Sequence, residues 1–280
     1  MCKTKPVSTW NCDKELIVLE KDTTNPVLGQ LTLWNTLKRR NANCLNFNQD
    51  GDLLCAGTDG RHIIVWNWAK NRTLTNYRPD IKGKISQIKF IDSAGSLDIV
   101  SASYDGQMLG TIVPPSGGAP MSSHCLYTHS GCVADFEIVP RSRHEILSAG
   151  DYGIVKFFDL RSSSAATTDA NSYDKPDITS AVYNHSGNEL LACYRRTGNC
   201  LFDSRNYTDG DFFHYYRKHY GDFNGKYFWD KNTEEILCEN MDEKAKTAIC
   251  LKPHPWKPML ATAALIKPGI HIWIPNGPIL

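Results

Sequence analysis

Four side chains that could bind zinc lie close together near the middle of the chain: His124, Cys125, His129 and Cys132. Imidazole nitrogens and thiolates are the ligands that zinc prefers. However, His129 also begins a stretch of strand and turn residues that recurs along the sequence. A recurring position indicates a structural role, so the sequence favours a structural histidine over a zinc ligand.

No other group of reactive side chains forms a catalytic motif. The Ser and His residues do not fit a nucleophile elbow, and the sequence contains neither a Gly-rich phosphate loop nor a metal-binding helix motif. His271 alternates with Ile270 and Ile272, which predicts an outward or edge position on a β-strand. We therefore expect a protein that is not an enzyme and that needs no cofactor or metal.

The repeated unit is about 45 residues long. Its first copy has an apolar strand ending at Phe47, the turn Asp50-Gly51, a strand of small residues, a second turn at Asp59-Gly60, and a strand ending in Trp66. Asp and Gly suit such turns, because Gly adopts positive φ and Asp bonds to its own backbone. The unit is therefore predicted to be a group of short strands joined by tight turns.

Four further copies follow the first. The residues that anchor the first strand of each copy are Phe47, Phe90, Phe136, Tyr183 and Leu251. Their separations are 43, 46 and 47 residues and then 68 residues. Since 68 residues cannot hold two whole units, we expect one damaged unit within residues 206–246, with its third strand at 226–230.

This repeat predicts an all-β propeller of about six blades, one of them incomplete. In such a ring each four-stranded blade buries both faces against its neighbours. Residues 28–37 form an isolated apolar strand before the first copy, and the last copy ends without room for an outer strand. We therefore predict that this strand closes the ring as the outer strand of the last blade. Residues 1–27 would be an N-terminal segment and residues 28–280 the propeller.

The composition favours a single domain that works outside the membrane. The chain has 280 residues, of which 41% are hydrophobic, and no apolar stretch approaches the length of a membrane span. Because 31 basic residues face 30 acidic ones, the net charge of +1 gives no bulk attraction to nucleic acid or anionic lipid. The first residues lead into no apolar signal region, so we expect a cytoplasmic or nuclear protein whose ten cysteines are reduced.

The unit closely resembles the WD repeat. His129 lies where WD units place a Gly-His pair, and the equivalent His in those units bonds to a strand Ser and a turn Asp. The resemblance assigns these roles to Ser148 and Asp151. The aromatic residue that completes the network is Trp in most units, but here it is Phe158. The resemblance therefore implies that the last hydrogen bond of the network is lost.

Three local patterns narrow this resemblance: Leu45-Asn46-Phe47-Asn48 with Trp66-Asn67-Trp68, Leu147-Ser148-Ala149-Gly150 with Asp159-Leu160-Arg161, and Cys250-Leu251-Lys252-Pro253-His254-Pro255 with Leu260-Ala261-Thr262. They are similar to the DDB-one-and-cullin-four-associated factor 8 type, substrate receptors of cullin-4 RING ubiquitin ligases, over residues from about 28 to 275. The family ring has seven blades, whereas a whole unit is missing here between Arg161 and Ile178.

In receptors of this type an aromatic-Asp-x-Arg blade ending docks to the ligase adaptor, which is itself a multi-propeller protein. The resemblance assigns that role to two blade endings, formed by Phe158, Asp159 and Arg161 and by Phe202, Asp203 and Arg205. A strand-end Arg can offer a planar set of donors to a partner's carbonyl or carboxylate groups. In the alternative interpretation each Asp terminates a strand and each Arg is solvated. The implied partners are the adaptor and a protein substrate of unknown identity.

Two basic runs are further candidates for partner contacts. Lys38, Arg39 and Arg40 precede the first full strand, and Arg195 and Arg196 occupy a turn where other copies carry Asp. Solvated loops and degenerate repeats would also explain them. Two other functions stay open: a WD-repeat scaffold that binds histone tails or RNA without a ligase, and, least favoured, a propeller hydrolase, for which the sequence shows no metal-binding carboxylates.

Overall fold

In the computed structural model, strands and tight turns account for nearly all of the described chain, which comprises residues 10–12, 16–19, 31–37, 41–91, 96–129, 131–140, 142, 144–153, 155–161, 165–166, 177–184, 186–194, 198–204, 214–217, 227–230, 236–239, 248–264 and 269–275. The one helical element among these residues is a 3-10 turn at Asp151–Gly153. No helix within these ranges has the length and apolar character needed to span a membrane. The all-β prediction is confirmed.

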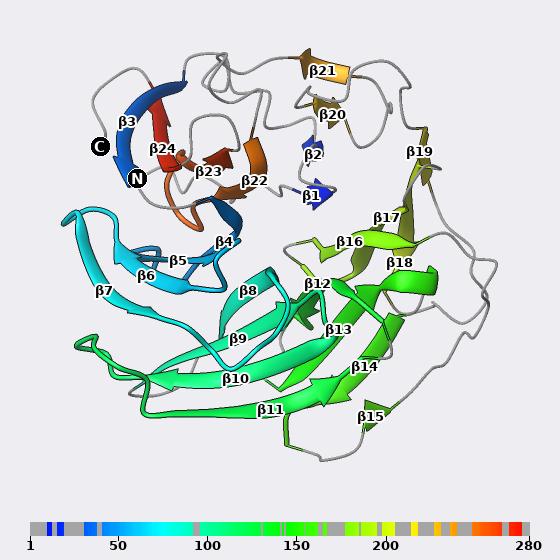
Figure 1. Ribbon diagram of the computed structural model, residues 1–280. Helices are drawn as coiled ribbons and strands as arrows, with labels where there is room; N and C mark the ends of the chain where they lie inside the picture. Colours follow the sequence, from blue (N-terminus) through cyan, green and yellow to red (C-terminus); the bar gives the residue numbers. More distant parts are fainter. Residues whose placement is uncertain are drawn as a thin grey trace.

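Four blades are each built from strands that follow one another in the chain and pair antiparallel (Figure 1). The first contains β4 (Ala42–Phe47), β5 (Leu53–Thr58), β6 (Ile63–Asn67) and β7 (Arg72–Tyr77). The second contains β8 (Ile85–Ile91), β9 (Leu97–Ser103), β10 (Gln107–Val113) and β11 (Ser122–Thr128). The third contains β12 (Val133–Ile138), β13 (Glu145–Gly150), β14 (Val155–Asp159) and β15 (Ala165–Ala166). The fourth contains β16 (Ile178–Tyr183), β17 (Glu189–Tyr194), β18 (Gly198–Asp203) and β19 (His214–Arg217).

The fifth regular blade joins the two ends of the chain. It consists of β22 (Ala248–Pro253), β23 (Leu260–Ala264), β24 (Gly269–Pro275) and β3 (Leu31–Leu37). β3, blue in Figure 1, pairs antiparallel with β24, in red, from Leu37 opposite Ile270 to Leu31 opposite Pro275. The predicted closing strand is therefore confirmed. It pairs the edge that β24 would otherwise leave open.

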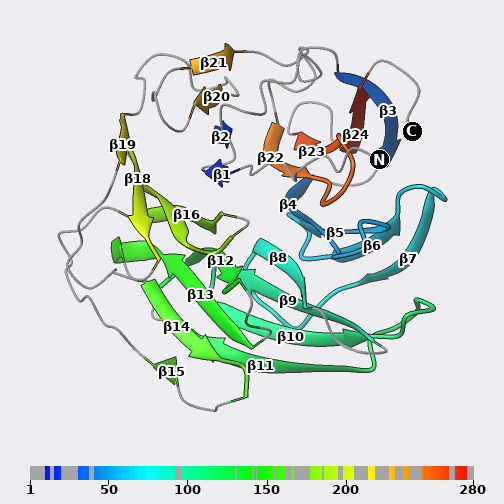
Figure 2. The ribbon, with the colours of Figure 1, turned by 180° about the vertical axis from the view of Figure 1, so that it is seen from behind.

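A further four-stranded sheet is built differently from the five regular blades. Its strands are β1 (Trp10–Cys12), β2 (Leu16–Leu19), β20 (Tyr227–Asp230) and β21 (Ile236–Glu239). β2 pairs with β20 in parallel, whereas β1 with β2 and β20 with β21 are antiparallel. Figure 2 shows the hairpin of β1 and β2 beside β20 and β21. β1 and β2, which lie within the predicted N-terminal segment of residues 1–27, thus supply two strands to the sheet that holds β20.

The apolar core lies between neighbouring blades. Trp66 on β6 and Trp273 on β24 are each 1% exposed. Trp66 belongs to a cluster that joins the first blade to the last through Leu45 and Ile272. Burial of both faces of a sheet explains why these strands are nearly continuously apolar.

Outer strands carry one extra residue at a β-bulge, and this residue packs against the next blade. The extra residues are Trp34 on β3, Leu74 on β7 and Leu126 on β11. Leu74 joins the cluster that contains Ile85 of the second blade. Trp34 meets Trp68, just after β6, with ring centroids 5.7 Å apart. The bulges therefore link consecutive blades at the rim of the ring.

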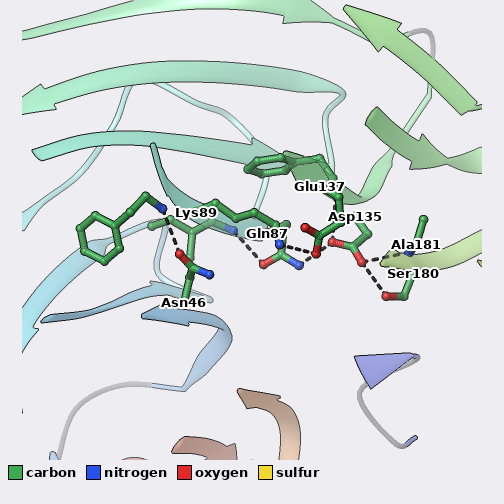
Figure 3. A network of polar contacts seen from close by, with 10 residues as sticks. Asn46, Gln87, Lys89, Asp135, Glu137, Ser180 and Ala181 are labelled. Carbon is green, nitrogen blue, oxygen red and sulfur yellow. Dashed lines mark hydrogen bonds and ion pairs between the residues drawn. The ribbon is translucent and has the colours of Figure 1, made fainter. Parts of the chain in front are cut away.

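Polar side chains connect the innermost strands (Figure 3). Asn46 Oδ1 accepts a hydrogen bond from the backbone N–H of Phe90 at 3.0 Å, and Gln87 Nε2 donates to Asp135 Oδ1 at 2.5 Å. The other Asp135 oxygen accepts from Ser180 Oγ at 2.5 Å and from the Ala181 N–H at 3.1 Å. Four successive inner strands, β4, β8, β12 and β16, are thereby tied together.

Charged groups reinforce the same inner ring. Lys89 on β8 forms an ion pair with Glu137 on β12. On the inner strand β22, burial disfavours the charged form of Lys252, but the negative charges of Glu137 and Asp135 outweigh it and raise its pKa. These opposite charges compensate one another, as buried charges must.

Candidate protein-interaction surface

Asp159 and Arg161 form a rigid, exposed pair at the end of β14. Arg161 donates from Nε to Asp159 Oδ1 at 2.9 Å and from Nη2 to Oδ2 at 2.5 Å, and its backbone N–H also donates to Oδ1. The Arg161 side chain is 64% exposed and that of Asp159 29%. These hydrogen bonds lower the pKa of Asp159 to about 2 and raise the pKa of Arg161. The guanidinium is thus held in one orientation while much of it faces solvent.

Phe158 supports this pair from inside the blade. It is buried and belongs to the apolar cluster that links the second and third blades. Its ring stacks on Tyr127 of β11 with centroids 5.5 Å apart, and Lys156 Nζ donates to the Tyr127 hydroxyl at 2.9 Å. The buried aromatic ring therefore supports the end of β14 from inside the blade.

The other predicted docking and partner residues are only partly described. Phe202 and Asp203, at the end of β18, are both half-buried, and Phe202 packs against the core of the fourth blade. The basic residues predicted to contact partners that lie outside the described residues are Lys38, Arg39, Arg40, Arg195, Arg196 and Arg205. The hydrogen bonds and exposure given above for Asp159 and Arg161 make this pair the predicted site whose geometry can be discussed further.

The predicted hydrogen bond between His129 and Ser148 is not present, so this part of the expected network is wrong. His129 is buried and its ring lies edge-on to Tyr127, with centroids 6.4 Å apart. Ser148 Oγ has no hydrogen-bond partner among the described residues, and the Asp151 carboxylate accepts the N–H of Cys132 at 2.9 Å. Within this part of the chain no group of three or more His, Cys, Asp or Glu side chains could hold a metal ion.

The last blade contains a hydrogen-bonded pair that was not predicted from the sequence. Trp273 Nε1 donates to Thr262 Oγ1 at 2.8 Å, a bond between neighbouring strands. Both residues are buried. The signal was present, because Thr262 in the last copy aligns with the small polar residue that the third copy carries at Ser148.

Two further expectations need correction. His271 is buried and does not occupy the predicted outward or edge position. β3 pairs beside β24, and Nδ1 of His271 lies 3.1 Å from Thr36 Oγ1 on that strand. Cys193 is disulfide-bonded, so the expectation that all ten cysteines are reduced is wrong at this position.

An aromatic cluster occupies the seam between the last and first blades. Trp68 Nε1 donates to the Gly51 carbonyl at 2.7 Å, and the ring of His254 lies 5.8 Å from that of Trp68. Trp256 is 68% exposed and is fixed by a 2.6 Å bond from Nε1 to the Gln49 carbonyl. The Lys252-Pro253-His254-Pro255 segment is one of the patterns that carry the family resemblance, but the sequence alone indicates no role for it.

Known proteins share the repeat and the fold. Residues 34–67 match the family model described as WD domain, G-beta repeat. The human DDB1- and CUL4-associated factor 6 is 29% identical over 45% of this chain and 14% of its own length. The human WD and tetratricopeptide repeats protein 1 is 26% identical over 50% of this chain and 20% of its own length. The chain thus matches only a small part of each relative.

Two crystal structures have a similar fold. Raptor from Chaetomium thermophilum gives a TM-score of 0.65 with 15% identity, over 93% of this chain and 31% of that one. The Cps50 (Swd1) β-propeller domain from Myceliophteria thermophila gives 0.57 with 13% identity, over 87% and 99%. These similarities concern the fold alone. With the repeat match and the five regular blades, they show an all-β propeller of the WD40 type.

Proposed function

We propose that this propeller is a substrate receptor that docks a target protein to a cullin-4 RING ubiquitin ligase. The observation that carries the proposal is the exposed Arg161 guanidinium, which Asp159 holds in a fixed orientation at a blade end. The similarity to the DDB1- and CUL4-associated factor 6 supports the same function.

The geometry suits recognition of a protein partner. An Arg side chain that is already oriented loses less conformational entropy on binding than a free one. Its planar group can donate several hydrogen bonds to carbonyl or carboxylate groups of the adaptor. Asp159 orients Arg161, and Phe158 packs beneath the strand end.

In this proposal the protein works by proximity. One surface binds the substrate while the blade end binds the adaptor, a multi-propeller protein, so that ubiquitin transfer takes place at high effective concentration. The finer parts of the proposal are a ring of six blades with the β20 sheet as the incomplete one, a relationship to receptors of the factor 8 type, and action in the cytoplasm or nucleus.

Co-purification tests the proposal. The parent chain, Arg161→Ala and a matched control, Arg72→Ala, are expressed with a tag, and the recovered adaptor and cullin-4 are measured. Arg72 is exposed and begins β7, the outer strand of the first blade, so it serves as an exposed Arg away from the predicted docking pair. A desolvated interfacial Arg contributes about 2 kcal/mol or more, so Arg161→Ala should reduce adaptor binding at least about tenfold.

The control should bind like the parent chain. Thermal unfolding of each variant confirms that the fold is intact, since a solvated Arg adds little to stability. If Arg161→Ala, alone and combined with Arg205→Ala, retains full adaptor binding, the ligase function is wrong. A WD-repeat scaffold without a ligase would then be the better description.

A further inference from the structure

The imidazole of His254 holds together the turn between β22 and β23. The His254 N–H donates to the Met259 carbonyl at 2.9 Å, which closes the turn. His254 Nδ1 accepts hydrogen bonds from the backbone N–H groups of Trp256 and Lys257, both at 3.0 Å. An imidazole nitrogen accepts a hydrogen bond only when it carries no proton. The turn as built therefore requires Nδ1 to be unprotonated.

The imidazole of His254 also packs closely against the first blade. His254 forms a hydrogen bond with the backbone of Gly51, and a Cβ atom on Gly51 would lie 2.4 Å from the ring nitrogen Nε2. Phe47 and Trp68 pack around it, with ring centroids 5.1 and 5.8 Å away. His254 thus joins the last blade to the first at the seam where the ring closes.

We propose that His254 is a proton-sensitive latch for this seam. The neutral imidazole holds turn 254–259 against the first blade. When a proton from solvent binds Nδ1, the N–H groups of Trp256 and Lys257 lose their acceptor and the turn is released. The exposed Trp256 indole, which is bonded to the Gln49 carbonyl of the first blade, moves with it. This inference is independent of the proposed ligase function.

The groups around His254 determine the pH range in which its ring takes up a proton. Burial disfavours the charged imidazole, and the Lys257 ammonium adds to this effect, so that together they lower the pKa of His254 below its ordinary value of 6.5 although the Gly51 backbone opposes them. The charged residues on the packed elements are Lys257 on its own turn, Asp50 and Asp52 beside Gly51, and Lys70 after Trp68. β3 and β23 carry no titratable side chain. The latch is therefore closed at neutral pH and opens in acid.

Nuclear magnetic resonance of the full chain tests the latch. Long-range proton–nitrogen spectra report the protonation of each His254 ring nitrogen across the pH range. Hydrogen exchange of the Trp256 and Lys257 amides, corrected for intrinsic rates, reports the turn. Protection of both amides should fall at least about tenfold as the ring titrates. Unchanged protection, or an Nδ1 already protonated at neutral pH, would overturn the inference.

A variant distinguishes protonation of His254 from a general destabilisation of the protein in acid. In His254→Asn the side-chain Oδ1 lies as far along the chain as Nδ1 and accepts the same N–H groups, but it does not protonate in this range. Its amide protection should be independent of pH, whereas the control His62→Asn, at a half-exposed site of the first blade, should behave like the parent. Equal acid loss in His254→Asn and the parent would exclude the latch. If His254→Asn does not fold, the measurements on the parent chain decide alone.

Discussion

Gln87 and Asp135 lie 48 residues apart in the sequence and hydrogen bond across the boundary between the second and third blades. Both side chains are buried. Asp135 also accepts hydrogen bonds from Ser180, from the Ala181 N–H and from the N–H of Phe136 at 2.8 Å. One carboxylate therefore connects three successive blades, and the residues that donate to it are all buried.

The first prediction follows from this arrangement. Asp135→Ala should lower the free energy of unfolding by about 3 kcal/mol or more, because it leaves several buried donors without an acceptor. Urea denaturation followed by circular dichroism measures the change. The control Asp52→Ala removes an exposed carboxylate from a turn and should stay within about 0.5 kcal/mol of the parent. Equal stability of the two variants would mean that the inner ring is not a stabilising network.

The second prediction concerns the charge state of Asp159. Its pKa is about 2, chiefly because of hydrogen bonds from Arg161, so the pair should stay intact until the pH approaches that value. Since the pKa is lowered on folding, the pair contributes stability above the ordinary value of 3.8 and loses it as the pH falls. Carboxyl carbon chemical shifts give the midpoint directly. In Arg161→Ala the midpoint should rise towards 3.8, and an unchanged midpoint would contradict the pairing.

The regular blades could be predicted from the sequence because their pattern is local. Short apolar runs and Asp-Gly turns fix each strand within its own unit. The closing strand, predicted at 28–37 and observed at Leu31–Leu37, followed from counting strands in the last copy. The pairing of β2 with β20 could not be foreseen in this way, since it brings Leu16 opposite Tyr227 in a parallel register. Nothing near either strand encodes that contact.

In the candidate site, too, local contacts could be predicted from the sequence and long-range contacts could not. Asp159 and Arg161 are two residues apart, so their pairing depends on little more than the strand end. The burial of His271 depends instead on β3, more than 230 residues earlier in the chain. Likewise, the role of His254 becomes visible only when Gly51 and Trp68 of the first blade are brought beside it. The alternation of apolar and polar residues within one strand cannot predict contacts between blades that lie far apart in the sequence.

The third prediction concerns thiol reactivity. Cys125 is exposed on β11, whereas Cys55 is buried and burial raises its pKa well above the usual value. Burial also raises the pKa of Cys200 to about 11. Because the thiolate is the reactive form, iodoacetamide near pH 8 should label Cys125 first and the other two only after unfolding. Peptide mass spectrometry against a urea-treated sample gives the order, and labelling of Cys55 as fast as Cys125 would contradict the packing.

The last prediction concerns ring closure. Trp273 is fully buried on β24, next to the closing strand β3, and Trp66 is equally buried in the first blade. Replacing either by Ala should lower the free energy of unfolding by about 3 to 5 kcal/mol, because the packed residues around the resulting cavity can relax only in part. Deleting residues 28–37 should cause early unfolding or aggregation, since it exposes the edge of β24.

Further variants distinguish the contribution of packing from that of hydrogen bonding where β24 pairs with β3. Trp273→Phe keeps most of the ring volume but removes the bond to Thr262, so we expect a loss of about 1 to 3 kcal/mol, as for a buried acceptor left unpaired. Thr32→Ala removes only an exposed 3.4 Å contact with Ile274 and serves as the control on β3. Thermal unfolding ranks these variants and the parent chain by stability. If Trp273→Ala melts like Thr32→Ala, or the deletion melts like the parent chain, then β3 does not close the ring in solution.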